Sequence, residues 1–531
     1  MLRRALPAFL LVAQSLPAQQ PAVPLYTDLG SHHRAITTKV PQAQQYFDQG
    51  LRLVYGFNHA EAIRSFTRAT ELDPGCAMCW WGIAYALGPH VNAGMDSASG
   101  VQAHAAAQRA LSARRDVPEW ERAYVGAVAA RYAPVPPADR ARLDSAYARE
   151  MGAVARKYPN DLDAQALYAE ALMDLRPWNY WTSEGKPYPG TEEIVRLLEG
   201  TIARNPEHPG ACHYYIHAVE AVTPEKAVPC AERLARLMPG VGHMVHMPAH
   251  IYVRVGRYND AAQSNVHAIH TDETFIEGQK PVTVYSLAYY PHNIHFLAFV
   301  STLAGRSAQA LEASRTLKAK VNLEVARGVF MLQEMVPYHV LTLTTFGRWD
   351  EVLAEPLPPS ELRMPLALAY YARGVALAAK GQFAEARVAL DSVRAIDAAT
   401  AANTDAKTAV SIAAHALMGE IATRSGNTEE GIAHFQEALK IEDAGLYFEP
   451  PRWYYPIRHS LGAALLKAGR NAEAEAVYRE DLKRFPENGW SLFGLAAALK
   501  AQGKTAEAAA VEQRLAKAWA GADVKLTGSR F

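Results

Sequence analysis

The sequence has few cysteines, no net charge and no long apolar run. Four cysteines in 531 residues are too few for disulfide bonds to be the main support of the fold. Lys and Arg total 54, as do Asp and Glu, and this balance favours no nucleic acid or anionic membrane as a partner. No run of about 18 apolar residues indicates a transmembrane segment. Hydrophobic residues make up 50% and charged residues 20% of the chain, which excludes wholesale disorder.

The first 18 residues have the pattern of a cleavable export signal. Arg3 and Arg4 precede an apolar stretch over residues 5–12, and a small residue, Ala18, follows shortly afterwards. A basic start, a short apolar stretch and a small residue before the cleavage point are typical of such signals. We therefore expect a signal peptide over 1–18, an N-terminal extended segment over 19–40, and a mature protein in the periplasm or outside the cell.

A period of about 34 residues organises the remainder of the chain. In each unit a small residue precedes a turn glycine, and an alanine, a large aromatic residue and often a proline follow. The pattern is clear in Leu461, Gly462, Leu465, Gly469, Ala474, Tyr478 and Pro486. Equivalent turn glycines are Gly256, Gly305, Gly347, Gly381 and Gly426. A glycine there can adopt positive φ and end the first helix of a pair, and the small residue lets the two helices approach closely.

This pattern resembles the tetratricopeptide repeat (TPR) family. The resemblance implies an all-α, right-handed superhelical solenoid of about a dozen helix–turn–helix repeats over residues 41–531. We divide it into N-terminal repeats over 41–190, histidine-rich central repeats over 191–347 and C-terminal repeats over 348–531. In such proteins the first helices line a concave groove. The resemblance therefore implies a peptide, a protein or a small molecule bound in the groove.

Seven of the nineteen histidines fall into three short clusters. They are His213, His217, His243, His246, His250, His292 and His295. Spacings of three and four place the members of each cluster on one face of a helix. The repeat register puts the second and third clusters on the groove side of two first helices. The first cluster reaches that side only if its hairpin turn is one residue short. We expect the three clusters to lie on neighbouring helices and to converge.

Clustered imidazoles predict a transition-metal site. Neutral imidazole is a common ligand of zinc, copper and iron, so we expect one of these metals. Met244 and Met247 favour copper by their thioether sulfurs, although their positions between the histidines indicate core packing. Glu220 and Glu334 are candidate carboxylates of the same groove, and Arg254 lies one turn beyond His250.

Three functions remain open at this point. The first is a binding protein whose groove contains the metal, and the second is a copper, iron or zinc enzyme that uses the same site. The third is a metal-free scaffold for protein–protein interaction, since TPR grooves also use polar side chains to hold a peptide carboxylate. The H-x2-H-x3-H run lacks the glutamate of the H-E-x-x-H zinc proteases, which excludes that class. No motif assigns a catalytic residue.

The cysteines and three insertions complete the sequence-based expectations. For Cys76 and Cys79 we favour packing thiols, with a local disulfide as the alternative in an exported protein. We expect Cys212 and Cys230 to lie on two helices of one hairpin, where they could pair. Aromatic insertions at 178–188 and 447–455, and a further insertion at 272–286, interrupt the repeats. Long loops of this kind are often lids or binding loops. His32 and His33 precede the first repeat and could fold into the groove.

Overall fold

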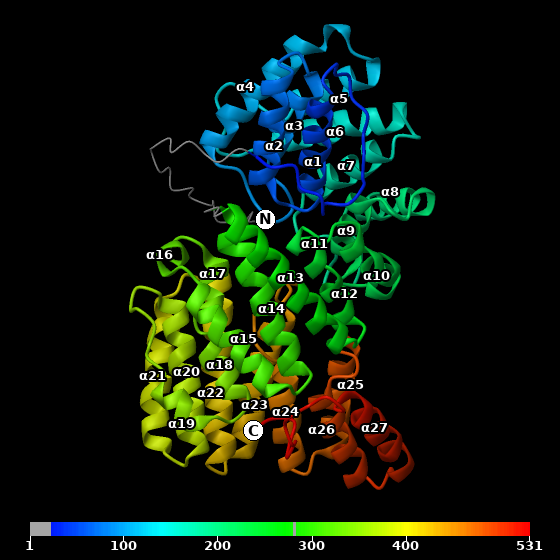
Figure 1. Cartoon of the computed structure of the whole chain (residues 1–531). Coiled ribbons are helices and arrows are strands. Elements are labelled where there is room, and N and C mark those ends of the chain that lie inside the picture. The colour runs from blue at the N-terminus through cyan, green and yellow to red at the C-terminus, as the bar shows by residue number, and fades with distance from the viewer. Residues whose placement is uncertain (1–22, 280–282) are drawn as a thin grey trace. The chain divides into compact units, whose positions relative to one another are not determined.

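The regular structure of the chain is helical. The computed structural model describes residues 23–279 and 283–531, and the secondary structure of these residues consists of helices and two isolated β-bridges (Figure 1). The expected all-α repeat fold is therefore confirmed. The proposed signal peptide, 1–18, lies outside the described residues. Among the described helices, none has both the length and the hydropathy needed to cross a membrane.

The chain divides into two compact units. Of the described residues, unit 1 comprises 23–251, 266–279 and 283–290, and unit 2 comprises 252–265 and 291–531. Three helices contain residues of both units: α12 (Pro248–Arg254), α13 (Tyr258–Gln279) and α14 (Tyr290–Leu303). The finer subdivision at residues 190 and 347 stays a prediction.

Unit 1 is a series of helices of 5 to 17 residues. They are α1 (Pro41–Tyr55), α2 (His59–Leu72), α3 (Ala77–Ala86), α4 (Ser97–Ala113), α5 (Glu119–Ala129), α6 (Ala141–Lys157), α7 (Leu162–Met173), α8 (Thr191–Arg204), α9 (Pro209–Val219), α10 (Val228–Leu237) and α11 (Gly242–His246). Successive helices pack against each other, as α1 does against α2 and α7 against α8 (Figure 1).

Unit 2 continues the same arrangement. Its helices are α15 (Ser307–Lys320), α16 (Leu323–Ala326), α17 (Phe330–Met335), α18 (Tyr338–Thr345), α19 (Trp349–Ala354), α20 (Arg363–Ala379), α21 (Phe383–Ala399), α22 (Asp405–Arg424), α23 (Thr428–Asp443), α24 (Ile457–Lys467), α25 (Asn471–Arg484), α26 (Gly489–Ala501) and α27 (Thr505–Ala518). Consecutive pairs such as α20 with α21 and α22 with α23 form hairpins.

The glycines of the repeat leave space for a large aromatic ring to pack against the helix backbone. A Cβ atom on Gly462 or Gly494 would lie only 2.3 or 2.2 Å from Cζ of Tyr478, which is fully buried. In unit 1 a Cβ atom on Gly50 would lie 2.6 Å from the ring of Phe66. Such distances are far below van der Waals contact, so only glycine allows the helices to pack this closely.

The turn glycines end the first helices as expected. Gly256, Gly305, Gly347, Gly381, Gly426 and Gly469 all have positive φ, between 67° and 100°. This is the left-handed region, which residues with a Cβ atom rarely adopt. The sequence pattern therefore identified both the hairpin turns and the close contact between helices.

Two expectations about local structure were wrong. The insertion expected at 272–286 is helical as far as Gln279, because α13 continues through it. Cys76 and Cys79 form a disulfide bond rather than packing as thiols. Cys76 is the N-cap of α3 and Cys79 follows one turn later, so their Cα atoms lie 5.3 Å apart, within the range that a disulfide requires. Cys212 and Cys230 are thiols whose Sγ atoms lie 2.6 Å apart.

The N-terminal segment, residues 23–40, crosses several helices of unit 1 without regular structure of its own. Its backbone N–H groups donate to buried side chains: Tyr26 N to Gln49 Oε1 at 2.8 Å and Thr37 N to Glu121 Oε1 at 2.6 Å. The Arg34 guanidinium pairs with Asp161 at 2.7 Å. These contacts fix the segment on the repeats.

Candidate metal centre

The first two histidine clusters lie on α9, α11 and α12 in unit 1. Helix α9 begins at Pro209, and its N-cap is His208, whose Nδ1 accepts the N–H of Ala211 at 3.1 Å. Proline at the first helical position and a capping acceptor together fix where the helix starts. The start in turn fixes the face that carries His213 and His217.

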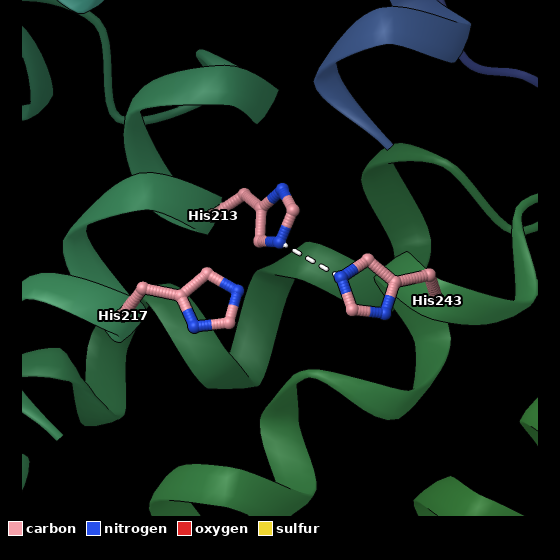
Figure 2. A group of neighbouring side chains, drawn as sticks. All are labelled: His213, His217 and His243. Carbon is pink, nitrogen blue, oxygen red and sulfur yellow. Dashed lines mark hydrogen bonds between the residues drawn. The ribbon is translucent and has the colours of Figure 1, made fainter. Parts of the chain in front are cut away.

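Three imidazoles of these clusters meet inside the unit. His213 and His217 come from α9 and His243 comes from α11, and Figure 2 shows their rings facing one another. The Nε2 atoms of His213 and His243 are 3.1 Å apart. One ring nitrogen from each of the three residues lies within 4.8 Å of the other two. All three side chains are at most 4% exposed, so water competes little for these nitrogens.

Hydrogen bonds determine which nitrogen of each ring faces the cluster. His213 Nδ1 donates to the backbone carbonyl of Tyr55 at 2.6 Å. His217 Nδ1 donates to Glu220 Oε1 at 3.2 Å. In a neutral ring the other nitrogen, Nε2, then has a lone pair. Among the described residues, the buried Nε2 of His217 has no hydrogen-bond partner.

Glu220 contacts a second histidine as well. Its Oε2 accepts a 2.6 Å hydrogen bond from Nδ1 of His250. Burial alone would raise the pKa of Glu220, but the neighbouring His250 and hydrogen bonds from His217 and His250 lower it to about 2. The group is therefore an ionised carboxylate that orients two imidazoles. A carboxylate behind a histidine is the usual companion of a metal-binding imidazole.

His246 and His250 form a second facing pair. Their Nε2 atoms are 2.8 Å apart, and their ring planes are nearly perpendicular, at 84°. Both side chains are at most 2% exposed. The structure thus brings together all five histidines of the first two clusters, together with Glu220.

Burial favours the neutral form of His213, His217 and His243. Loss of hydration lowers the pKa of His213 and His243 well below its ordinary value, and the neighbouring imidazoles lower it further. Burial also lowers the pKa of His217, although Glu220 opposes the change. A neutral ring is the form that binds a metal.

Aromatic side chains enclose the cluster. The Phe57 ring centre lies 4.5 Å from that of His213 and 5.5 Å from that of His243. Trp178, from the predicted insertion at 178–188, lies 5.1 Å from His217, and its Nε1 donates to Asn92 Oδ1 at 3.0 Å. Trp178 therefore brings part of the insertion into contact with the site. Phe57 gives no sequence signal, although it lies in the turn between α1 and α2 with a positive φ of 56°.

A further histidine pair that the sequence analysis did not select lies behind Phe57. The rings of His59 and His90 are 4.3 Å apart, and that of His90 is 4.7 Å from Phe57. Burial lowers the pKa of His59 to about 4. His59 Nδ1 donates to the backbone carbonyl of Ala86 at 2.9 Å. A bond to a carbonyl is typical of a structural histidine.

The third cluster, His292 and His295, lies in unit 2, as do the candidate residues Glu334 and Arg254. His295 is buried, its ring is 4.1 Å from that of Tyr338, and burial lowers its pKa to about 3. His292, His295 and Glu334 line one small cavity of about 20 Å³ in this unit. Glu334 pairs with Arg452 at 2.8 Å. The convergence of His292 and His295 with the first two clusters stays a prediction of the repeat register.

Arg254 and the two methionines, Met244 and Met247, make contacts that are typical of structural residues. Arg254 donates to the backbone carbonyl of Arg484 at 2.8 Å and lies 5.5 Å from the Tyr447 ring, which is in the insertion at 447–455. Met244 and Met247 are fully buried, in line with the expected core packing.

A second buried polar group in unit 1 surrounds Asp163. Its carboxylate accepts hydrogen bonds from Tyr55 Oη at 2.5 Å and from Arg34 at 2.9 Å. His32 and His208 lie 3.0 and 3.3 Å from the same carboxylate. His32 thus folds onto the repeats, as the sequence analysis allowed, and His33 pairs with Asp48 at 2.7 Å.

The comparisons with known proteins agree with the repeat architecture. A family model described as tetratricopeptide repeat matches residues 459–523. No curated protein matches the sequence. The matched residues span helices α24 to α27, so the family match supports the sequence-based prediction of tetratricopeptide-type hairpins in this part of the chain.

Solved structures of helical repeat proteins align over most of the chain at low identity. Human IFIT1 with m7Gppp-AAAA is 13% identical, with 91% of each chain covered and a TM-score of 0.31. Yeast Tom70 is 11% identical, with 90% of each chain covered and a TM-score of 0.31. The structure of Naa15/Naa10 bound to HypK is 13% identical over 90% of this chain and 70% of that chain, with a TM-score of 0.23.

Proposed function

We propose that this chain is a repeat protein that binds a transition-metal ion through His213, His217 and His243. The observation that supports this most strongly is the buried Nε2 of His217, which has no hydrogen-bond partner among the described residues. An unsatisfied buried polar atom costs about 1–3 kcal/mol. A metal ion bound by the three imidazoles would remove that cost and use the Nε2 lone pairs that the Nδ1 contacts leave available on His213 and His217.

The donor set restricts the class of metal. Neutral imidazoles without thiolate suit zinc, copper and iron, and are unsuited to calcium or magnesium, which prefer oxygen ligands. Three histidines also leave a coordination position for a ligand from outside. A TPR-type scaffold supports protein and ligand binding, so we infer that the metal helps to hold the molecule bound by the repeats.

Metal binding is tested with the purified full chain. After equilibration with Zn²⁺ and dialysis, we expect the wild type to retain at least one tightly bound ion by elemental mass spectrometry. His217→Ala removes one ligand and should weaken the binding at least 10-fold in a chelator competition. The matched control is His339→Ala, which removes another buried histidine, bonded to Ser314. An apo wild type, or equal affinity in wild type and His217→Ala, would contradict the proposal.

We also propose that the protein is exported. The basic and apolar pattern of residues 1–18 supports this, and so does the Cys76–Cys79 disulfide, since such bonds persist in oxidising compartments. Expressed from its full gene in a Gram-negative bacterium, the chain should be recovered from the periplasm with Gln19 as its first residue. N-terminal sequencing checks this. An uncleaved chain confined to the cytoplasm would refute it.

A further inference from the structure

We infer that unit 1 binds two metal ions next to each other, the second one through His246 and His250. This inference rests on the proposed function and extends it. Both residues lie in the same unit as His213, His217 and His243.

The two pairs of facing imidazoles have the same geometry. The Nε2 atoms are 3.1 Å apart in His213 and His243 and 2.8 Å apart in His246 and His250. Ring centres are 4.9 and 4.8 Å apart in the two pairs, and both pairs are edge to face. Two ligands next to each other on one ion, each with a metal–nitrogen bond of about 2.0–2.1 Å, are separated by about 3 Å. Each pair thus has the spacing of two ligands of one ion.

Each pair also contains one ring whose outer nitrogen is already engaged. His213 Nδ1 donates to the Tyr55 carbonyl, and His250 Nδ1 donates to the Glu220 carboxylate. In the neutral form of either ring, Nε2 is therefore an acceptor that faces the partner ring. A hydrogen bond between two imidazoles can explain one such pair. Two adjacent pairs, with a fifth imidazole nearby, are explained better by cations.

The ring-centre distances place the two facing pairs next to each other. The ring centres of His243 and His246 are 5.9 Å apart, as are those of His217 and His250. These separations are about 1 Å longer than those within the pairs. Metals in two-metal sites of proteins are about 3.5–4 Å apart, a spacing that two neighbouring histidine groups of this kind can provide.

Glu220 links the two sites. One of its oxygens accepts from His217, a ligand of the first site, and the other accepts from His250, a ligand of the second. A single buried negative charge therefore lies behind both ions. It orients one ligand of each and offsets part of their charge.

Stoichiometry distinguishes this inference from the proposed function. Titration of the apo full chain with Zn²⁺ against a chromophoric chelator, with elemental analysis of the product, should give two ions per chain. The double variant His246→Gln/His250→Gln should retain one ion, and so should His213→Gln/His243→Gln. His339→Gln is the control for loss of a buried histidine, and thermal unfolding verifies that each variant is folded. If the double substitutions prevent folding, the single variant His250→Gln must lower the affinity for the second Zn²⁺ ion at least 10-fold.

The remaining outcomes each have a definite meaning. One ion in the wild type and one in His246→Gln/His250→Gln would overturn the second site and leave the first intact. No ion in that double variant would show a single shared site and would also overturn the inference. No ion in the wild type would refute the proposed function itself. With Cu²⁺ bound, two adjacent ions should give a weakened, magnetically coupled paramagnetic resonance signal that becomes an ordinary single-ion spectrum in either double variant.

Discussion

Replacing Asp163 with alanine should destabilise unit 1 by about 3–5 kcal/mol, the usual cost of removing one partner from a buried ionic group. The carboxylate is 7% exposed and contacts Arg34, Tyr55, His32 and His208. Without it the Arg34 guanidinium, which lies 4.4 Å from the centre of the Trp120 ring, would keep only Asp161 as an anionic partner. Urea denaturation at pH 7 measures the loss.

The matched control is Asp116→Ala, which removes an exposed carboxylate from the same unit. It should change the free energy of unfolding by less than about 0.5 kcal/mol, as surface substitutions usually do. Equal stability of the two variants would mean that the Asp163 group contributes nothing measurable.

The effect of Asp163 should depend on pH in one direction. Burial alone would raise the pKa of Asp163, but His32, the hydrogen bonds from His208 and His32, and Arg34 lower it well below its ordinary value. The lowered pKa means that the folded state favours the ionised form. The stabilisation is therefore complete above the unfolded pKa of about 3.9 and is lost as pH falls through the folded pKa. Denaturation at pH 7 and pH 3 should show a smaller difference between wild type and Asp163→Asn at the lower pH.

The repeat fold could be predicted because its determinants are local. Gly462 and Tyr478 recur at fixed spacings in other hairpins, and the close approach that they permit depends on size alone. A turn glycine such as Gly469 is similarly informative, since positive φ recurs at the equivalent glycines of other hairpins. The cysteine pair was misjudged for a related reason. Cys76 and Cys79 fit the spacing of a packed helix start as well as that of a disulfide, and spacing alone does not separate the two.

The candidate site could be predicted only in part. Helical spacing was enough to group His213 with His217 and His243 with His246, because residues three or four apart share a face. The partner of His213 is Tyr55, which lies 158 residues away, and neither residue indicates the other in the sequence. Phe57 likewise reaches the cluster only through packing between helices that are distant in the sequence.

Glu220 was predicted as a groove carboxylate, and the structure gives it a more specific place. Both of its oxygens accept hydrogen bonds from outer nitrogens of histidines. Sequence spacing explains its contact with His217, three residues earlier on the same face. The contact with His250, which is 30 residues away, depends on how α9 and α12 pack.

Replacing Glu220 with glutamine should weaken metal binding about 10–100-fold, the usual effect of losing a carboxylate behind a metal-binding histidine. A glutamine side chain accepts a hydrogen bond through its oxygen but donates through its nitrogen. It therefore satisfies only one of His217 and His250. The other ring must accept at Nδ1 and move its proton to Nε2, where it occupies the lone pair that a metal needs. The change leaves size and shape nearly unaltered, so the loss follows from the position of one proton.

Chelator competition at pH 7.5 measures this effect, with Glu199→Gln as the matched control. Glu199 is an exposed carboxylate of unit 1 that accepts from Tyr215 at 2.8 Å, away from the histidines. Its amide variant should bind Zn²⁺ like the wild type. If two ions bind, Glu220→Gln should weaken the binding of one ion more than that of the other. The more affected site is the one whose histidine moves its proton to Nε2. Wild-type affinity in Glu220→Gln would show that the carboxylate does not set the orientation of the ligands, because the amide cannot accept from both rings at once.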